Sequence, residues 1–142
     1  MTRRRKPLTR PPSLSLPPQA IHAGPDSVAR LLDAAPELLE EVSTGGARPL
    51  HICGMSKRGQ RAAKLLVERG ARVDTLDTYG YPPLFRMASN NLPEGARALL
   101  EGGADVFFES EAGETAASIA ASSHAWDVLK VLEAHAAAVE GK

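Results

Sequence analysis

His51 and Cys53 are the two side chains whose types and spacing come closest to a catalytic pair. An imidazole that removes the proton of a nearby thiol turns the cysteine into a nucleophile. These residues are only two positions apart at the start of a predicted helix, and residues at that spacing do not share a helical face. The sequence therefore favours structural roles for both side chains over nucleophilic catalysis.

No other group of residues supplies the chemistry of an enzyme or of a metal site. His22, His124 and His135 have none of the spacings that are typical of metal ligands. The single cysteine excludes a cysteine-based zinc cluster and a disulfide within the chain. Neither of the glycine-rich phosphate-binding patterns, G-x-x-x-x-G-K-S/T and G-x-G-x-x-G, follows a predicted strand. We therefore expect a protein that is not an enzyme, with no cofactor, no bound metal and no small-molecule substrate.

The length and the charge of the chain narrow the class of protein further. With 142 residues, the chain is about the size of one domain. It carries 17 Lys and Arg residues against 17 Asp and Glu residues, so its formal net charge is zero. Five of the cations lie in the first 25 residues, which hold no acid, so the rest of the chain carries a net charge of −5. This distribution excludes a uniformly basic nucleic-acid binder but is compatible with a basic tail on an acidic body.

Residues 1–17 form the basic, proline-rich start of the chain. They hold four prolines and no periodic apolar face, so we expect a disordered or locally extended tail. Three roles for the tail remain open. It is a solvated terminus, or a patch for nuclear import or for an acidic or nucleic-acid partner, or an organelle-targeting peptide. Its prolines disfavour the helix that organelle-targeting peptides form. No apolar run is long enough to cross a membrane, so we expect a cytoplasmic protein, with a nuclear or organellar location as the alternative. The cations of the patch are Arg3, Arg4, Arg5 and Lys6.

Two sequence motifs recur along the rest of the chain. The first covers residues 46–51 (GARPLH) and returns at residues 80–85 and 113–118, after 34 and then 33 positions. The second covers residues 66–74 and returns at residues 99–106, so that both motifs keep one register. Apolar residues between them follow helical spacing. The sequence therefore predicts a repeat protein, in which each unit buries its apolar stripe against the next one.

The period and both motifs resemble the ankyrin repeat, which has 33 residues and the signature T-P-L-H-x-A. The resemblance covers nearly all of the chain from Pro18 to about Ala138. It implies an all-α fold, a solenoid of stacked helix-turn-helix units with short β-turn or hairpin fingers. The predicted ankyrin repeat domain spans residues 18–139. It contains an N-terminal capping repeat, two complete repeats and a C-terminal capping repeat, at residues 18–45, 46–79, 80–112 and 113–139.

The resemblance also implies structural roles for single residues. His51 takes the position of the signature histidine that ties turns together, and Cys53 takes that of a small buried alanine. In the third unit Pro82 and Phe85 replace the Thr and the His of the signature, so the side-chain hydrogen bond at that helix start should be missing. Gly95 lies inside a predicted helix of the same unit, at a cost of about 1 kcal/mol relative to Ala. We therefore expect the third unit to be the least stable.

Ankyrin domains typically bind proteins or extended peptides with the tips of their fingers and the exposed face of each first helix. The resemblance therefore implies a non-catalytic protein–protein interaction module, a scaffold or adaptor whose partner is a protein. Tyrosine and arginine are enriched at binding hot spots, and both tyrosines of the chain flank Gly80 on one predicted finger. The alternative for these tyrosines is that they pack along the hairpin. The predicted partner-binding residues are Tyr79, Tyr81, Arg86, Met55, Asn90, Thr78, Ser89 and Ile52.

The remaining aromatic residues leave further alternatives open. Phe107 and Phe108 either stack against the final repeat, which we favour, or form a second patch. Trp126 is interpreted as packing of the last repeat rather than as a binding residue. A second function also fits the sequence, that of a structural or accessory subunit of a larger assembly. In that case the basic tail contacts an acidic partner or nucleic acid, and nucleic acid is expected as a partner only through this tail.

Overall fold

The computed structural model describes residues 18–140, which fold into helices joined by turns and loops. Within this range no residue belongs to a β-strand, which confirms the all-α prediction. The basic cluster Arg3, Arg4, Arg5 and Lys6 lies outside the described residues.

Short 3-10 helices are η2 (Pro36–Glu40), η3 (Thr44–Gly46) and η4 (Cys53–Met55). The α-helices are α1 (Pro18–Ala23), α2 (Pro25–Ala34), α3 (Pro49–Ile52), α4 (Lys57–Gln60), α5 (Ala63–Glu68), α6 (Pro83–Ser89), α7 (Pro93–Glu101), α8 (Ala116–Ser122) and α9 (Trp126–Glu140).

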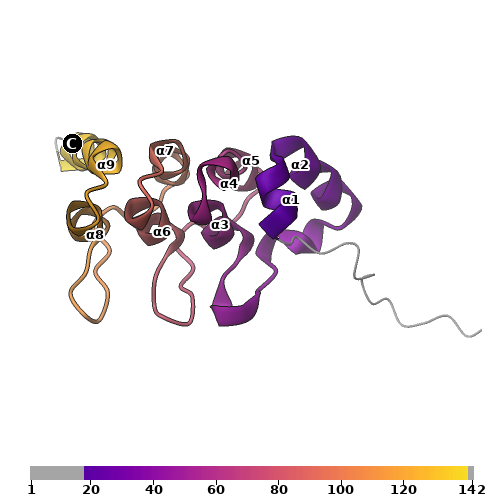
Figure 1. Cartoon of the computed structure of the whole chain (residues 1–142), viewed down its shortest axis with the longest axis horizontal. Helices are drawn as coiled ribbons and strands as arrows, with labels where there is room; N and C mark the ends of the chain where they lie inside the picture. Colours follow the sequence, from indigo (N-terminus) through magenta and orange to yellow (C-terminus); the bar gives the residue numbers. More distant parts are fainter. Residues whose placement is uncertain (1–17, 141–142) are drawn as a thin grey trace, which may run out of the picture.

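The helices lie in two rows along the long axis of the molecule (Figure 1). The first row runs through α1, α3, α6 and α8, each of which contacts the next. The second row contains α2, α4, α5, α7 and α9, and within it α5 contacts α7 and α7 contacts α9. Loops extend from the first row, on the side away from the second row (Figure 1). The chain thus forms a two-layered slab with projecting loops along one side.

Three of these loops, which we call fingers 1, 2 and 3, have the same backbone arrangement. They cover residues 43–47, 77–81 and 110–114, and in each the first N–H donates to the last carbonyl at 2.8, 3.0 and 2.8 Å. The fourth residue of each finger is a glycine, Gly46, Gly80 or Gly113, with φ of 74, 78 and 81°. Side chains rarely adopt this left-handed conformation, which is why glycine occupies the position. The fingers therefore recur at the 34- and 33-residue spacing of the sequence motif.

Prolines begin three of the helices, and a threonine precedes a fourth. Pro49, Pro83 and Pro93 lie in the first turn of α3, α6 and α7, where a missing backbone donor costs nothing. Thr115 begins α8 differently, because its side chain accepts the N–H of Ser118 at 3.1 Å. Helix α6 has no side-chain hydrogen bond at its start, as predicted from the replacement of the signature Thr and His by Pro82 and Phe85.

One apolar core fills the space between the two rows. It runs without interruption from Ile21 in α1 to Leu132 in α9, and Cys53 is fully buried within it. Glu133 is exposed, in agreement with an outer face at the end of the slab. Within residues 18–140 no helix is both long and apolar enough to span a membrane. The core holds the first row of helices, and with it the fingers, in fixed positions.

Candidate functional site

Asp77, the first residue of finger 2, organises the site around the two tyrosines. Its side chain is buried, with 7% of the residue exposed. One carboxylate oxygen accepts the backbone N–H groups of Tyr79 and Tyr81 at 2.9 and 3.0 Å. The other accepts the Arg86 guanidinium at 2.8 Å. A buried carboxylate requires such partners because an unpaired charge in the interior is costly, so Asp77 fixes finger 2 to helix α6.

Arg86 lies between this carboxylate and the ring of Tyr81. Its guanidinium carbon is 5.7 Å from the centre of the Tyr81 ring, within the range of a cation–π contact. Burial alone would raise the pKa of Asp77, but hydrogen bonds from Tyr81, Arg86 and Tyr79 outweigh burial and hold the pKa below its usual 3.8. The ion pair therefore stays charged over the physiological pH range. Arg86 is partly exposed, and its position is fixed before any partner binds.

Tyr81 connects finger 2 to its neighbours on both sides. Its hydroxyl donates to Glu114 Oε1 of finger 3 at 2.9 Å, and this hydrogen bond raises the pKa of the phenol. Its ring packs against Phe85 with centroids 5.4 Å apart, and Phe85 packs edge-on against Phe108 at 5.7 Å. Tyr79 contacts the edge of this row at 6.5 Å from Tyr81 and is 71% exposed. The structure thus separates the two tyrosines: Tyr81 packs along the finger, and Tyr79 faces solvent.

His51 links finger 2 to helix α3 rather than taking part in proton transfer. Nδ1 accepts the backbone N–H of Arg48 at 3.2 Å, and Nε2 donates to the carbonyl of Tyr81 at 2.8 Å. Burial lowers the pKa of His51 below its usual 6.5, so the ring is neutral at pH 7 with both nitrogens occupied. Burial disfavours the charged form of Cys53 in the same way, and for a thiol this raises the pKa. A buried protonated thiol is a poor nucleophile, which agrees with the structural roles predicted for both residues.

Two hollows border Tyr81. The first, which we call the inner hollow, has a volume of about 240 Å³ and lies between α6 and α8. The second, the outer hollow, has a volume of about 580 Å³ and lies between fingers 2 and 3. Arg86, Ser89, Ser122 and Ser123 are among the residues of the inner hollow. Leu76, Thr78, Tyr79, Phe108, Glu109 and Glu111 are among those of the outer hollow.

Most of the predicted binding residues border these hollows or lie beside them. Tyr79 and Thr78 line the outer hollow, and Arg86 and Ser89 line the inner one. Two further predicted partner-binding residues are Met55 and Asn90. Met55 is half-exposed, and the amide of Asn90 donates to the Gly54 carbonyl at 2.7 Å.

Ile52 was predicted to bind a partner, and this prediction is wrong. Only 3% of the residue is exposed, because its side chain belongs to the core between the two rows. Helix α3 is only four residues long, from Pro49 to Ile52, and every one of these residues is buried. The exposed apolar side chain of this part of the chain is that of Met55, in the 3-10 helix that follows.

The two phenylalanines have different roles. Phe108 stacks edge-on against Phe85 of α6, while the predicted stacking against the final repeat stays a prediction. Phe107 is 50% exposed, so it has the character of a patch. Trp126 contacts His124 edge-on at 5.5 Å and is also half-exposed, so it packs less closely than expected.

Sequence reasoning missed the roles of Asp77 and Glu114. The two hydrogen bonds to Asp77 from the backbone of its own finger could have been expected from an Asp that begins the turn sequence Asp-Thr-Tyr-Gly-Tyr. The bond between Tyr81 and Glu114 spans 33 positions of the sequence. Only the repeat period could have indicated that these residues are neighbours.

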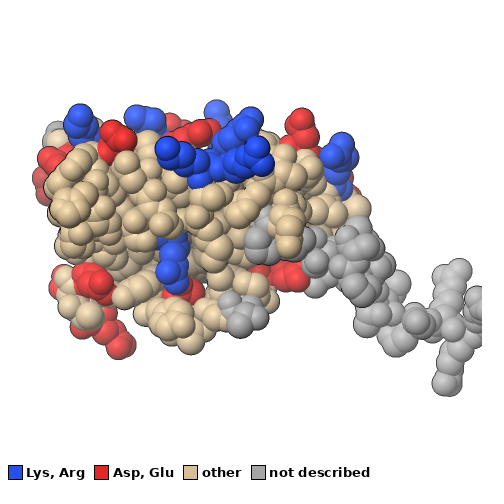
Figure 2. All heavy atoms as spheres, in the orientation of Figure 1, with Lys and Arg blue, Asp and Glu red and all other residues tan. Residues whose placement is uncertain are grey.

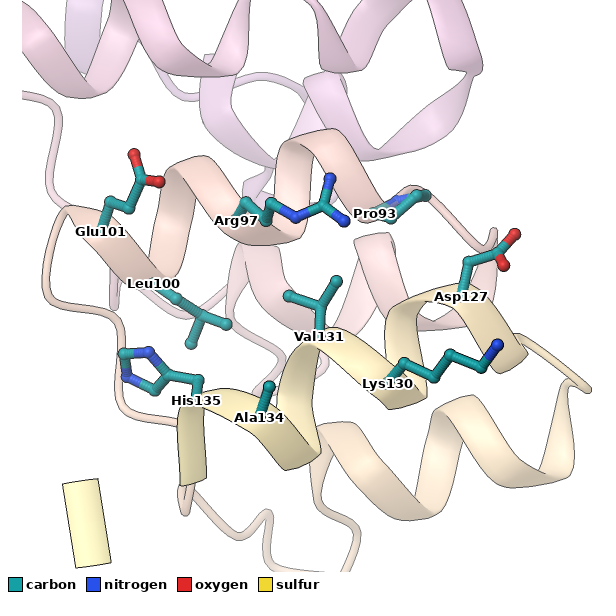
Figure 3. A pocket seen from close by; sticks show the side chains of 9 residues that line it. All are labelled: Pro93, Arg97, Leu100, Glu101, Asp127, Lys130, Val131, Ala134 and His135. Carbon is teal, nitrogen blue, oxygen red and sulfur yellow. The ribbon is translucent and has the colours of Figure 1, made fainter. Parts of the chain in front are cut away.

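A third hollow, of about 680 Å³, lies on the second row, between α7 and α9 (Figure 3). Leu100 and Val131 point into it from the two helices, while Arg97 and Glu101 on α7 and Lys130 on α9 lie along its rims. No residue that lines it carries a hydroxyl or a thiol. Among the described residues, no cluster of three or more His, Cys, Asp or Glu side chains could hold a metal ion.

Charge is distributed unevenly over the slab. Figure 2 shows acidic side chains on the loop below α8, and Lys and Arg side chains mainly along the second row of helices. Glu109 and Glu111 are exposed in and beside finger 3, and Glu114 is partly exposed. The edge that carries the outer hollow is therefore acidic.

The chain matches no family model and no curated protein.

Proposed function

We propose that residues 18–139 form a four-unit stack of the ankyrin type, which acts as a non-catalytic protein-interaction module. The main support for the stack is the recurrence of one finger backbone, with the same hydrogen bond and the same left-handed glycine, after 34 and 33 residues. The turns after α5 and α7 agree, since Ala71 and Ala104 each donate to the carbonyl five residues earlier, at 3.0 Å. Units that repeat in this way bury their apolar stripes against each other.

The observation that carries the binding function is the fixed polar and aromatic cluster between the two hollows. Arg86 is held by Asp77, and Tyr81 is held by Glu114, so neither side chain has to be ordered when a partner arrives. Preorganised side chains bind more tightly because less conformational entropy is lost. Tyr79 next to this cluster offers a large, exposed aromatic surface, which is the kind of side chain that dominates interface energetics.

The chemistry of the described residues supports binding over catalysis. His51 uses both ring nitrogens in structural hydrogen bonds, and the Cys53 thiol is buried and protonated. The serines of the inner hollow have no histidine among the residues that line the same hollow. A general base within hydrogen-bond reach is what a serine nucleophile needs.

Replacing Tyr79 with Ala tests the proposal. We expect the affinity for a protein partner to fall by about 2 kcal/mol or more, because an exposed tyrosine beside a fixed arginine has the properties of a hot spot. The partner is obtained by cross-linking to the full chain, and its affinity is measured by titration calorimetry. Tyr79 is preferred to a double Tyr79 and Tyr81 replacement, since Tyr81 also holds finger 3.

Val139→Ala serves as the matched control, because Val139 is a similarly exposed apolar residue at the far end of α9. It should leave the affinity unchanged. Equal affinities of the Tyr79→Ala variant and the unmodified chain would remove finger 2 from the binding surface.

A structural subunit of a larger assembly is the second candidate, and the hollow between α7 and α9 favours it. This hollow lies on the row opposite the fingers. Its floor contains the buried Leu100, and the more accessible Val131 and Ala134 lie between charged rims. In this case a charge at its centre, as in Val131→Glu, would prevent assembly, whereas Tyr79→Ala would not. Sedimentation of the two variants together with the captured partner separates the two functions.

A further inference from the structure

The outer hollow combines an apolar side with an acidic side. Finger 2 and the residue before it contribute the apolar side, with the largely exposed side chains of Tyr79 and Leu76. Finger 3 and its flank contribute the acidic side, with Glu109 and Glu111. Neither carboxylate belongs to an ion pair found among the described residues. A ligand that fits this hollow would bring several cations close to an apolar side chain.

The segment of residues 1–17 of the same chain has this composition. Arg3, Arg4, Arg5 and Lys6 are followed two positions later by Leu8, and no acid interrupts them. The remainder of the chain carries a net charge of −5, which attracts such a segment. Charge complementarity therefore favours this segment as the occupant of the hollow.

The length of the segment is sufficient to reach the hollow. Residue 18 begins α1, and α1, α3, α6 and α8 are successive neighbours in the first row. Packed helices lie about 8–10 Å apart, so the three steps from α1 to α8 cover roughly 24–30 Å. An extended chain spans about 3.3–3.6 Å per residue, so Leu8 can lie roughly 33–36 Å and Lys6 roughly 40–43 Å from Pro18. The helices that carry fingers 2 and 3, α6 and α8, are within this range, with several ångströms left for the projection of the fingers.

We propose that residues 3–8 dock in the outer hollow of their own chain, with Leu8 against Tyr79 of finger 2 and Arg3–Lys6 against Glu109 and Glu111. The order along the chain agrees with this arrangement, because Leu8 is closer to α1 than the cations are, and finger 2 is closer to α1 than finger 3 is. The docked segment covers Tyr79 and competes with a protein partner for it. This contact goes beyond the proposed binding function and does not depend on the identity of a partner.

A paramagnetic label near the start of the full chain tests the contact. A Thr2→Cys variant is labelled with a nitroxide, and Cys53 stays unlabelled because its thiol is fully buried. In the ¹⁵N-labelled protein at low salt, we expect the amide signals of Glu109, Glu111 and Tyr79 to lose intensity, while those of α2 and α7 do not. Raising the salt to about 1 M, where the Debye length is about 3 Å, should restore the signals.

Charge reversal provides the matched control. Glu109→Lys with Glu111→Lys should abolish the intensity loss, and combining it with replacement of Arg3, Arg4, Arg5 and Lys6 by Glu should restore it. Uniform or absent loss in the labelled chain at low salt would overturn the proposal without affecting the proposed binding function. In a second experiment, nitroxide-bearing chain at natural nitrogen abundance is mixed with ¹⁵N chain that has no nitroxide. A loss of signal in this mixture would also overturn the proposal, because the occupant of the hollow would then be the segment of a second copy. The salt titration uses unreversed finger residues, so the test holds even if the reversed variants fail to fold.

Discussion

Asp77 is the residue on which the geometry of the candidate site depends. Three hydrogen bonds end on its two carboxylate oxygens, two from the backbone of finger 2 and one from Arg86 of helix α6. Removing a carboxylate from water is unfavourable, and the ion pair and the hydrogen bonds must compensate for it. A substitution at this position therefore separates the effect of charge from that of hydrogen-bond acceptance.

Two substitutions of Asp77 measure these effects. Asp77→Asn keeps an oxygen that can accept the N–H groups of Tyr79 and Tyr81 but removes the charge that holds Arg86. We expect it to lower the free energy of unfolding by about 1–2 kcal/mol. Asp77→Ala also removes the acceptors and should cost about 3 kcal/mol or more, because the N–H groups of Tyr79 and Tyr81 then lose their partner in addition to the lost ion pair. Urea denaturation followed by circular dichroism measures both values, and equal losses would show that the backbone hydrogen bonds contribute little.

His51 makes the stability of the molecule depend on pH. Its folded pKa lies below the usual 6.5, because burial opposes the charged ring while Tyr81 and Asp77 act in the opposite direction. Below pH 6.5 the unfolded chain binds a proton that the folded chain does not bind, so the stabilisation present above pH 6.5 is lost as the pH falls toward the folded pKa.

The measurement for His51 is the free energy of unfolding as a function of pH. We expect it to fall as the pH decreases below 6.5 toward the folded pKa of His51, and to fall less steeply in a His51→Gln variant, which has no group to protonate at this position. The other histidines are present in both proteins, so their contributions cancel in the comparison. Parallel curves would show that His51 protonates equally well in the folded and unfolded chains.

At the scale of the elements, the glycines of the fingers allow a comparison between equivalent positions. Gly46 and Gly80 have nearly the same φ, 74 and 78°. A Cβ at Gly46 would lie 2.8 Å from the backbone nitrogen of Thr78 in the next finger, whereas a Cβ at Gly80 would meet nothing within 4 Å. The first glycine permits close contact between fingers, and the second only permits the turn.

Alanine at each position should reveal this difference. Gly80→Ala should cost about 1–2 kcal/mol, which is the price of the left-handed conformation for a residue with a side chain. Gly46→Ala carries the same cost and about 1–3 kcal/mol more, because the backbone of finger 2 must shift to make room. Thermal or urea unfolding of the two variants gives the values. A larger loss in Gly80→Ala would contradict the close packing of fingers 1 and 2.

Local signals made much of the element order predictable. Prolines in the first turns of α3, α6 and α7 act within their own helices, so the sequence alone indicates these starts. The break between α4 and α5 was not predicted. Gln60 at the end of α4 uses its side chain to accept the N–H of Gly95 in α7 at 2.9 Å, and a contact across 35 positions leaves no local pattern.

The candidate site was predictable in part for the same reason. Tyr79 and Arg86 were identified from residue type and from their place in the predicted finger and helix, and both border a hollow. Ile52 was predicted to bind a partner, but every residue of the short helix α3 is buried, Ile52 among them. The role of Glu114 depends on how finger 3 lies beside finger 2, and only the assembled chain determines this arrangement.

At the scale of the whole molecule, stability is shared between neighbouring elements. In the first row α6 packs against both α3 and α8, and in the second row α7 packs against both α5 and α9. Helices at the ends of such a slab have a neighbour on one side only. The glycine in α7 does not leave a void either, because Met87 and Gln60 occupy the space next to Gly95.

Hydrogen exchange of the folded chain tests how this packing distributes stability. We expect the amides of α6 and α7 to exchange most slowly, because helices with neighbours on both sides open only when the larger part of the core opens. This is the opposite of the sequence-based expectation, which places the least stable unit at residues 80–112 because of Gly95 and the missing cap of α6. A Leu132→Ala variant, which opens a cavity at the end of the core, should increase exchange first in α8 and α9 and leave α1 and α2 unchanged. Faster exchange in α6 than in α8 of the unmodified chain would show that the local defects outweigh the contacts on both sides.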